Sequence, residues 1–190
     1  MKNPLADKIL FLKVKSQDPE AYGRFYDLYV NRIYRFIFFK VNSSAEAQDI
    51  TSEVFLKCWQ YIKEGKEIKN LNSFVYIIAR NKVIDFYRQK SRETTSSIND
   101  PDAPEIMDEA KDLLLKQMQD SDLESVLAGM SHLKDEYKEV VVLRFMDELS
   151  IGEMAEILNK TQGSVRVLLH RALKALKENV NEQPGNNTKD

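Results

Sequence analysis

The sequence predicts an all-α protein made of two small helical domains joined by an acidic linker. Apolar residues recur at spacings of three and four along most of the chain, which is the periodicity of amphipathic helices. No run of strict alternation between turn signals indicates a strand. The chain has 190 residues, of which 43% are hydrophobic, enough to give one ordinary domain or two small ones a buried core.

The first domain, residues 1–92, is expected to contain three helices. Asp18 can cap the first of them, and Pro19 lies where a missing N–H costs nothing. The apolar stripe of this helix ends near Val41 and comprises Phe25, Leu28, Tyr29, Ile33, Phe36 and Ile37.

The second helix begins at Ser43 or Ser44, and Glu46 completes a possible capping box from Ser43. Its predicted buried side holds Ile50, Val54, Phe55, Leu56, Cys58 and Trp59. Residues 66–72 form a loop after Gly65. A third helix, over about 73–90, buries Phe74, Ile77, Ile78 and Ile84. Three such helices can share one core.

Residues 93–124 have the composition of a linker, since Ser, Asn and Pro are followed by an excess of acids. The acids are opposed only by Lys111 and Lys116, and they are Asp100, Asp102, Glu105, Asp108, Glu109, Asp112, Asp120, Asp122 and Glu124. A solvated spacer and a transient or docking helix over 106–119 are both compatible with this composition.

The second domain, residues 125–180, is expected to end in a helix-turn-helix. One helix runs to about Met146, with Tyr137, Val140, Val141 and Phe145 on one side. A capping box of Ser150 and Glu153 starts the next helix, Asn159 and Lys160 make a turn, and Thr161 caps the last helix. Residues 181–190 form a polar tail that we expect to be disordered.

The last helix has the charge that DNA recognition needs, because no acid precedes Glu178. Its basic and ionisable residues are Arg166, His170, Arg171, Lys174 and Lys177. We expect Arg166 to contact a base, with guanine as the candidate, and Arg171 and Lys174 to contact phosphates. Gln162, Gly163 and Ser164 allow a close approach to base edges. A basic surface helix of an ordinary bundle is the alternative.

A second basic patch, with aromatic residues between its charges, lies in the first domain. It comprises Arg80, Lys82, Arg88, Lys90 and Arg92. Such a patch suits single-stranded nucleic acid, whose bases stack on aromatic rings. Most of the rings should be core, and Tyr76 and Tyr87 are the ones expected to be exposed.

These segments resemble the bacterial sigma-70 family, in particular its extracytoplasmic-function branch, which has regions 2 and 4 alone. The resemblance covers about residues 20–92 and 125–178. It rests on FYDLYVNRIYRFI (25–37), AQDITSEVFLKCW (47–59), SFVYIIARNKVIDFYR (73–88) and LSIGEMAEILNKTQGSVRVLLHRALKAL (149–176). The sequence departs from the family at Phe74, where tryptophan is common, and at Val167 and Leu168, where polar or basic residues are frequent.

The resemblance implies a sigma factor that gives core RNA polymerase its promoter specificity. The residues it implies for docking on the polymerase β′ clamp helices are Asp49, Ile50, Glu53, Val54 and Lys57. Those implied for the −10 element are Asn72, Ser73, Tyr76, Arg80, Asn81, Asp85 and Arg88. Those implied for the −35 element are Gln162, Ser164, Arg166, Val167, His170, Arg171 and Lys174.

The partners implied by the resemblance are core RNA polymerase, through its β′ clamp helices and β flap, promoter DNA, and an anti-sigma factor. In the family the linker threads polymerase channels that otherwise hold nucleic acid, so its carboxylates are expected to mimic phosphate charge and to yield to growing RNA.

The residues themselves argue against an enzyme and suggest no cofactor and no metal. Cys58 is the only cysteine and lies in an apolar stretch, as a core thiol would. A metal-dependent nuclease using Asp49, Glu53 and Asp85 is a competing class. It lacks HxxE, HD and HExxH motifs, and both histidines lie in the other domain.

A second alternative is a stand-alone helix-turn-helix transcriptional regulator whose first domain senses a ligand or dimerises. No window of about 18 uninterrupted apolar residues is present, and the first residues lack the apolar core of a signal peptide. We therefore expect a cytoplasmic protein with no membrane insertion.

Overall fold

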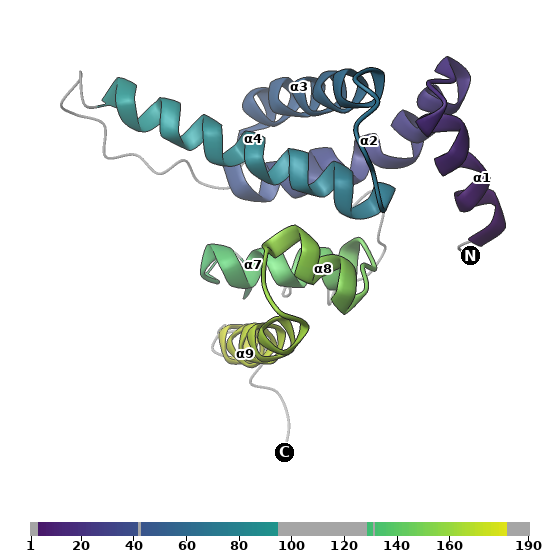
Figure 1. Ribbon diagram of the computed structural model, residues 1–190. Helices are drawn as coiled ribbons and strands as arrows, with labels where there is room; N and C mark the ends of the chain where they lie inside the picture. The colour runs from purple at the N-terminus through teal and green to yellow at the C-terminus, as the bar shows by residue number, and fades with distance from the viewer. Residues whose placement is uncertain (1–3, 42, 95–128, 131, 182–190) are drawn as a thin grey trace. The chain divides into compact units, whose positions relative to one another are not determined.

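The computed structural model describes residues 4–41, 43–94, 129–130 and 132–181 (Figure 1). All regular elements within these ranges are helices, and they contain no strand, which confirms the all-α class. The helices fall into two compact units, one built from α1 to α4 and the other from α7 to α9. Most of the predicted linker (93–124) and all but the first residue of the predicted tail (181–190) lie outside the described residues. The domain limits themselves stay a prediction.

The first unit begins with α1 (Pro4–Lys15), a helix that the sequence patterns did not predict, packed against α2 (Pro19–Val41). The predicted cap of α2 is confirmed, since Asp18 Oδ1 accepts hydrogen bonds from the amides of Glu20 (2.9 Å) and Ala21 (3.2 Å). The predicted stripe of α2 is wrong at Leu28, whose side chain is 56% exposed.

Two further helices complete this unit, α3 (Ser44–Lys63) and α4 (Leu71–Thr94). α4 starts two residues earlier than predicted. The reason is Asn70, whose side-chain oxygen accepts hydrogen bonds from the amides of Asn72 (2.7 Å) and Ser73 (3.3 Å). A cap that the sequence reading placed inside a loop therefore sets the beginning of the helix.

Aromatic rings hold α2 and α3 together. The ring of Tyr22 lies 4.7 Å from that of Trp59, and Phe25 lies 5.9 Å from Phe55 in an edge-on arrangement. The Tyr22 hydroxyl donates a hydrogen bond to the Phe55 carbonyl, and burial raises the pKa of Tyr22 well above its ordinary value. The packing fixes which faces of the two helices point outward.

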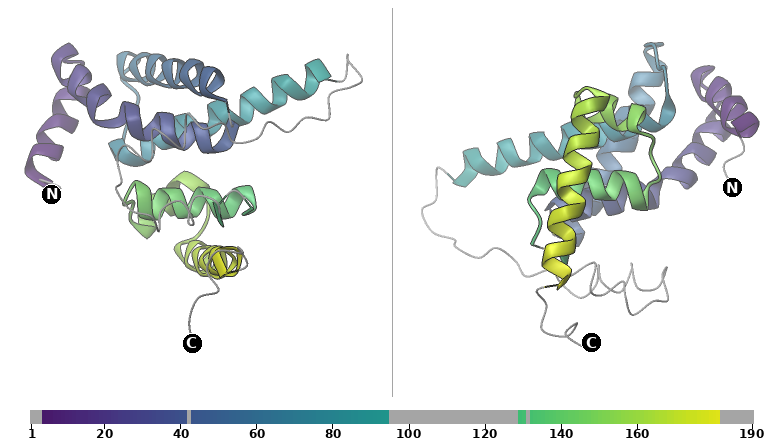
Figure 2. Two further views of the ribbon diagram at one scale, coloured as in Figure 1. Left: turned by 180° about the vertical axis from the view of Figure 1, so that it is seen from behind. Right: turned by 90° about the horizontal axis from the view of Figure 1, so that it is seen from below.

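The second unit contains α7 (Asp135–Val141), a π-helical turn η1 (Val142–Met146), α8 (Ile151–Leu158) and α9 (Gln162–Asn181). α9 packs against both α7 and α8 (Figure 2). The sequence predicted one uninterrupted helix to about Met146 with Phe145 on its apolar side. The end of the helix is confirmed, since α7 continues directly into η1 and η1 ends at Met146, but the placement of Phe145 is wrong, because this residue is 56% exposed.

Candidate nucleic-acid interface

The entry to the helix-turn-helix is fixed by a reciprocal pair of hydrogen bonds. Ser150 Oγ accepts from the Glu153 amide (3.2 Å), and Glu153 Oε2 accepts from the Ser150 amide (2.8 Å). This capping box was predicted and is confirmed. Two of the amides at the beginning of α8, those of Ser150 and Glu153, are satisfied by these side chains, so α8 begins at a defined residue.

The turn between α8 and α9 also follows the prediction. Asn159 adopts the left-handed conformation (φ 52°, ψ 47°), and the Lys160 amide donates to the Ala155 carbonyl (3.0 Å). Thr161 Oγ1 then accepts from the Ser164 amide (3.1 Å) and caps α9. Each residue of this turn is fixed by its own backbone conformation or by a hydrogen bond to a near neighbour, and together they set the direction of α9 relative to α8.

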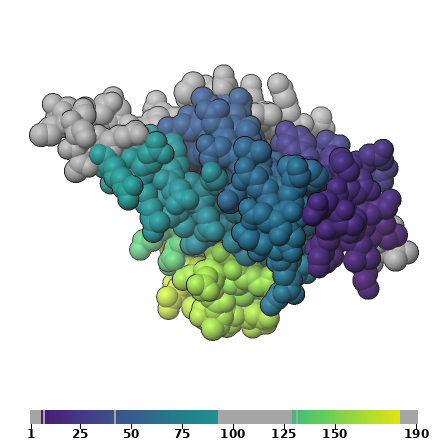
Figure 3. All heavy atoms as spheres, turned by 45° about the horizontal axis from the view of Figure 1, so that its top comes forward, coloured from purple at the N-terminus to yellow at the C-terminus, as the bar shows by residue number. Residues whose placement is uncertain are grey.

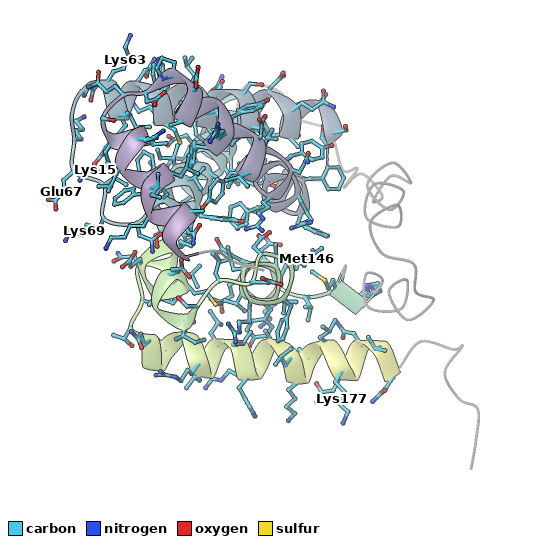
Figure 4. The ribbon with its side chains drawn as sticks, turned by 90° about the vertical axis from the view of Figure 1, so that its right-hand side faces the viewer. Lys15, Lys63, Glu67, Lys69, Met146 and Lys177 are labelled. Carbon is cyan, nitrogen blue, oxygen red and sulfur yellow. The ribbon has the colours of Figure 1, made fainter. Side chains whose placement is uncertain are left out.

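α9 exposes a continuous polar and basic surface. Its inward side is fixed by Val165 and Ala172, both fully buried. All the α9 side chains predicted to contact the −35 element are exposed: Gln162, Ser164, Arg166, Val167, His170, Arg171 and Lys174. Figure 4 shows Lys177 pointing outward from the same helix.

Little of the positive charge of this surface is neutralised from within α9. The Arg166 guanidinium donates to the neutral Gln162 side chain (3.4 Å). The first acid of the helix is Glu178, which lies 3.9 Å from Lys174 in an exposed pair that contributes little energy. The helix therefore offers positive charge and hydrogen-bond donors to an anionic partner, and an α-helix fits the major groove of B-DNA.

The second candidate surface lies on α4. Asn81, Asp85 and Arg88 are exposed at helical spacing, and Arg88 Nη1 lies 3.8 Å from Asp85 Oδ1. Arg80 is half-buried. Asn72 is half-buried as well, and its side chain accepts a hydrogen bond from the Tyr29 hydroxyl.

The prediction that Tyr76 and Ser73 are exposed contact residues of α4 is wrong. Tyr76 is fully buried, with its ring 5.3 Å from that of Phe36 in an edge-on arrangement, and Ser73 is 2% exposed. Ser73, Tyr76 and Ala79 follow one another at spacings of three, so they lie on one side of α4, and that side packs inward. Tyr87 is exposed as predicted, at 47%.

A third surface lies on α3. Asp49, Glu53 and Lys57 are exposed, as polymerase-docking residues must be. Ile50 (6% exposed) and Val54 (0%) are instead core residues, so their prediction as docking residues is wrong. Their places in the helix put them on its inward side.

Sequence reasoning missed Leu56, which was assigned to the core and is 59% exposed. It lies at helical spacing from Asp49 and Glu53 and so shares their face. The signal that could have found it is that spacing, which places it opposite the fully buried Val54 and Cys58.

Two ion pairs join α3 to α4, Lys82 to Glu53 (2.7 Å) and Lys90 to Glu46 (3.3 Å). Figure 3 shows the two helices, α3 in blue and α4 in teal, as neighbours on one face of this unit. The α3 and α4 surfaces therefore lie next to each other on this unit. A protein bound to the first and a nucleic acid bound to the second would be held close together.

No group of His, Cys, Asp and Glu side chains among the described residues is arranged to hold a metal ion. Cys58 is buried, and that burial raises the pKa of its thiol far above the ordinary range. Among the described helices, none combines the length and the apolar character needed to cross a membrane.

Comparisons with known families match both units. A family model described as sigma-70 region 2 matches residues 25–93, and one described as sigma-70, region 4 matches residues 123–176. The sigma factor BldN of Streptomyces coelicolor is 30% identical over 166 residues, which are 86% of this chain and 62% of that protein. SigW of Bacillus subtilis is 27% identical over 176 residues, 90% of this chain and 94% of SigW. Both relatives are named as ECF RNA polymerase sigma factors.

Two solved structures share the fold, each with a TM-score of 0.66. One is CnrH in complex with the cytosolic domain of CnrY, 18% identical and covering 94% of this chain and 99% of that one. The other is RpoE of Bartonella quintana with the anti-sigma factor NepR, 19% identical and covering 85% of this chain and 98% of that one.

Proposed function

The chain belongs to the extracytoplasmic-function branch of the sigma-70 family of RNA polymerase sigma factors, and from this premise we propose how its two units divide the work of transcription initiation. It confers promoter specificity on bacterial core RNA polymerase. The second unit reads the upstream (−35) element through α9. The first unit docks on the polymerase through α3 and contacts the melted −10 element through α4. Like other sigma factors, the chain itself catalyses nothing, and it acts in the cytoplasm.

The observation that carries the proposal is the outward surface of α9. Its predicted contact residues are all exposed, its phase is fixed by two buried residues, and no acid precedes Glu178. We assign base contact to Arg166 and phosphate contact to Arg171 and Lys174. Arg166→Ala should weaken binding to the upstream element by about 1–3 kcal/mol and relax the preference at one base. An equal loss on specific and random DNA would make Arg166 a phosphate contact.

For the polymerase side we assign the α3 face formed by Asp49, Glu53, Leu56 and Lys57 to the β′ clamp helices. Ile50 and Val54 support this face from beneath, since both are core residues. An apolar side chain ringed by charges is the usual composition of a protein-binding surface, with an anchor at its centre and a polar rim.

For the −10 element we assign the exposed α4 residues Asn81, Asp85 and Arg88, together with the half-buried Arg80 and Asn72. Tyr76 and Ser73 act by shaping the helix from the inside. Two further partners follow from the family, the polymerase β flap for the second unit and an anti-sigma factor. The support for the latter is that RpoE of Bartonella quintana was solved with one.

The experiment is co-elution of the purified chain with bacterial core RNA polymerase, followed by run-off transcription from genomic promoter fragments. A stoichiometric complex that initiates at discrete sites is the expected result. No complex, together with tight operator binding by the chain alone, would instead favour a stand-alone helix-turn-helix regulator.

A paired variant tests the assignment of α3. Asp49→Asn with Glu53→Gln should impair binding to core polymerase while the helical content is retained. The matched control is Asp27→Asn with Glu136→Gln, which removes the same charge at two other exposed positions. Equal affinity of both variants for core polymerase would remove the α3 face from the interface.

A further inference from the structure

One line of residues runs down the outermost side of α9. Gly163, Val167, His170 and Lys174 follow one another at spacings of four, three and four, so they lie above one another on the helix. This line lies opposite the buried Val165 and Ala172 and is exposed throughout. Val167 is in its interior and is 51% exposed.

An exposed valine is ordinary on most protein surfaces, but the place of this one is informative. Arg166 and Arg171 lie on either side of it, and His170 and Lys174 lie below it. The charged side chains around this valine, Arg166, Arg171 and Lys174, are all positive, whereas those around Leu56 on α3 are of both signs. The surroundings of this valine therefore suit a polyanion that presents one small apolar group.

Gly163 lies one turn before Val167 and has no structural need to be glycine. It is not among the positive-φ residues of the chain. A Cβ atom added there would meet only Thr161 Oγ1, at 3.9 Å. Since neither the backbone nor the packing requires a glycine, its effect is to leave open space beside Val167, at the end of α9 where helix-turn-helix proteins approach base edges.

The apolar group on the floor of the major groove is the C5-methyl of thymine, which apolar side chains contact. We propose that Val167 contacts the C5-methyl of a thymine in the upstream promoter element, and that Gly163 provides the clearance for this contact. The inference rests on the proposed function and deepens it, because it names one base that α9 reads and the atoms involved.

The test uses the complex of the full chain with core polymerase, on a promoter identified by the run-off assay. Each thymine of the upstream element is replaced singly by deoxyuridine, which removes only the methyl group. At one position the affinity should fall about fourfold, which is the ~0.8 kcal/mol of one buried methylene converted at 1.4 kcal/mol per factor of ten.

Val167→Ala should bind the thymine promoter and the deoxyuridine promoter with equal affinity, so that the ratio of the two affinities falls to one. Val167→Ile should retain the wild-type ratio. The matched control is Leu173→Ala, which removes another exposed apolar side chain (39% exposed) from the same helix. It should leave the ratio at its wild-type value.

The outcomes separate this inference from the proposed function. If no deoxyuridine changes the affinity, or if the ratio persists in Val167→Ala, the thymine contact is refuted while a complex that still initiates upholds the sigma-factor role. If no complex forms with core polymerase, the proposed function fails first. Circular dichroism of each variant checks that the helical content of the chain is retained.

Discussion

Replacing Gly163 by alanine should stabilise α9 and weaken its binding to DNA, two effects of opposite sign from one methyl group. Glycine in a helix is less favourable than alanine by roughly 0.5–1 kcal/mol, because it loses more backbone freedom on folding. At Gly163 nothing offsets the gain, since the nearest atom to the added Cβ would be Thr161 Oγ1 at 3.9 Å. Native-state hydrogen exchange of the α9 amides in the full chain measures this stabilisation.

The loss appears on DNA, because the added methyl group occupies the clearance beside Val167. Forcing an extra methyl group into a closely packed contact typically costs about 1–3 kcal/mol. Affinity for the upstream element in the polymerase complex should therefore fall about 5- to 140-fold. Competition binding against the wild-type chain on the same promoter fragment measures the ratio directly.

The matched control is Gly23→Ala in α2, an exposed helical glycine whose added Cβ has no heavy atom within 4 Å. It should raise the free energy of unfolding of the first unit by a similar amount. The fluorescence of Trp59, the only tryptophan of the chain, measures this unfolding. Gly23→Ala should not change promoter affinity. If Gly163→Ala binds the upstream element as tightly as wild type, the first turn of α9 does not approach the groove closely and the reasoning is refuted.

Three further variants or labels probe the fold beneath the site. Gly129→Ala should destabilise the second unit by about 1–3 kcal/mol, because the added Cβ would lie 2.8 Å from Val180 Cγ2; unchanged hydrogen exchange in α9 would contradict this. Ser150→Ala removes the cap of the Glu153 amide and should cost about 1 kcal/mol by the same measurement; no increase in exchange would mean that water replaces the cap fully. Cys58, whose thiol pKa is raised by burial, should react with a disulfide reagent only in denaturant; rapid labelling of the native chain would show that the first unit opens.

The features that the sequence predicted best are those fixed within a few residues. The capping box of Ser150 and Glu153, the left-handed Asn159 and the cap at Thr161 depend on neighbours in the chain, so their residue types are enough to place them. The helix-turn-helix could therefore be predicted almost to the residue. The cap at Asn70 is equally local, but its neighbours resemble a loop, and the beginning of α4 was placed late.

The phase of α3 and α4 could not be read in the same way, because apolar residues occur on both of their faces. Val54 and Leu56 are both apolar, and only the helical spacing that puts Leu56 on the face of Asp49 and Glu53 separates the fully buried Val54 from Leu56, which is 59% exposed. The prediction that Tyr76 is exposed failed for a related reason, since a tyrosine suits both a core and a base-stacking surface. Only the packing of α4 in the folded unit decides between them.

Three exposed apolar residues lie among the charged side chains of α3, α4 and α9, whereas Leu28 and Phe145, which the sequence also placed on apolar faces, lie on faces assigned to no partner. Leu56 lies on the face of α3 with Asp49 and Glu53, Ile84 (37% exposed) lies beside Asp85 on α4, and Val167 lies between the arginines of α9. Each of these faces is one that we assign to a partner on independent grounds of charge and family.

A protein gains nothing in the free state by exposing such side chains, because burying each one would stabilise the fold through the hydrophobic effect. A surface that must bind has a reason to keep them, since an apolar group desolvated on binding adds affinity that charge alone does not supply. The exposure of Leu56, Ile84 and Val167 is therefore consistent with the partners that we assign to their faces. Binding surfaces are places where the exposure of a side chain can disagree with the pattern of the sequence around it.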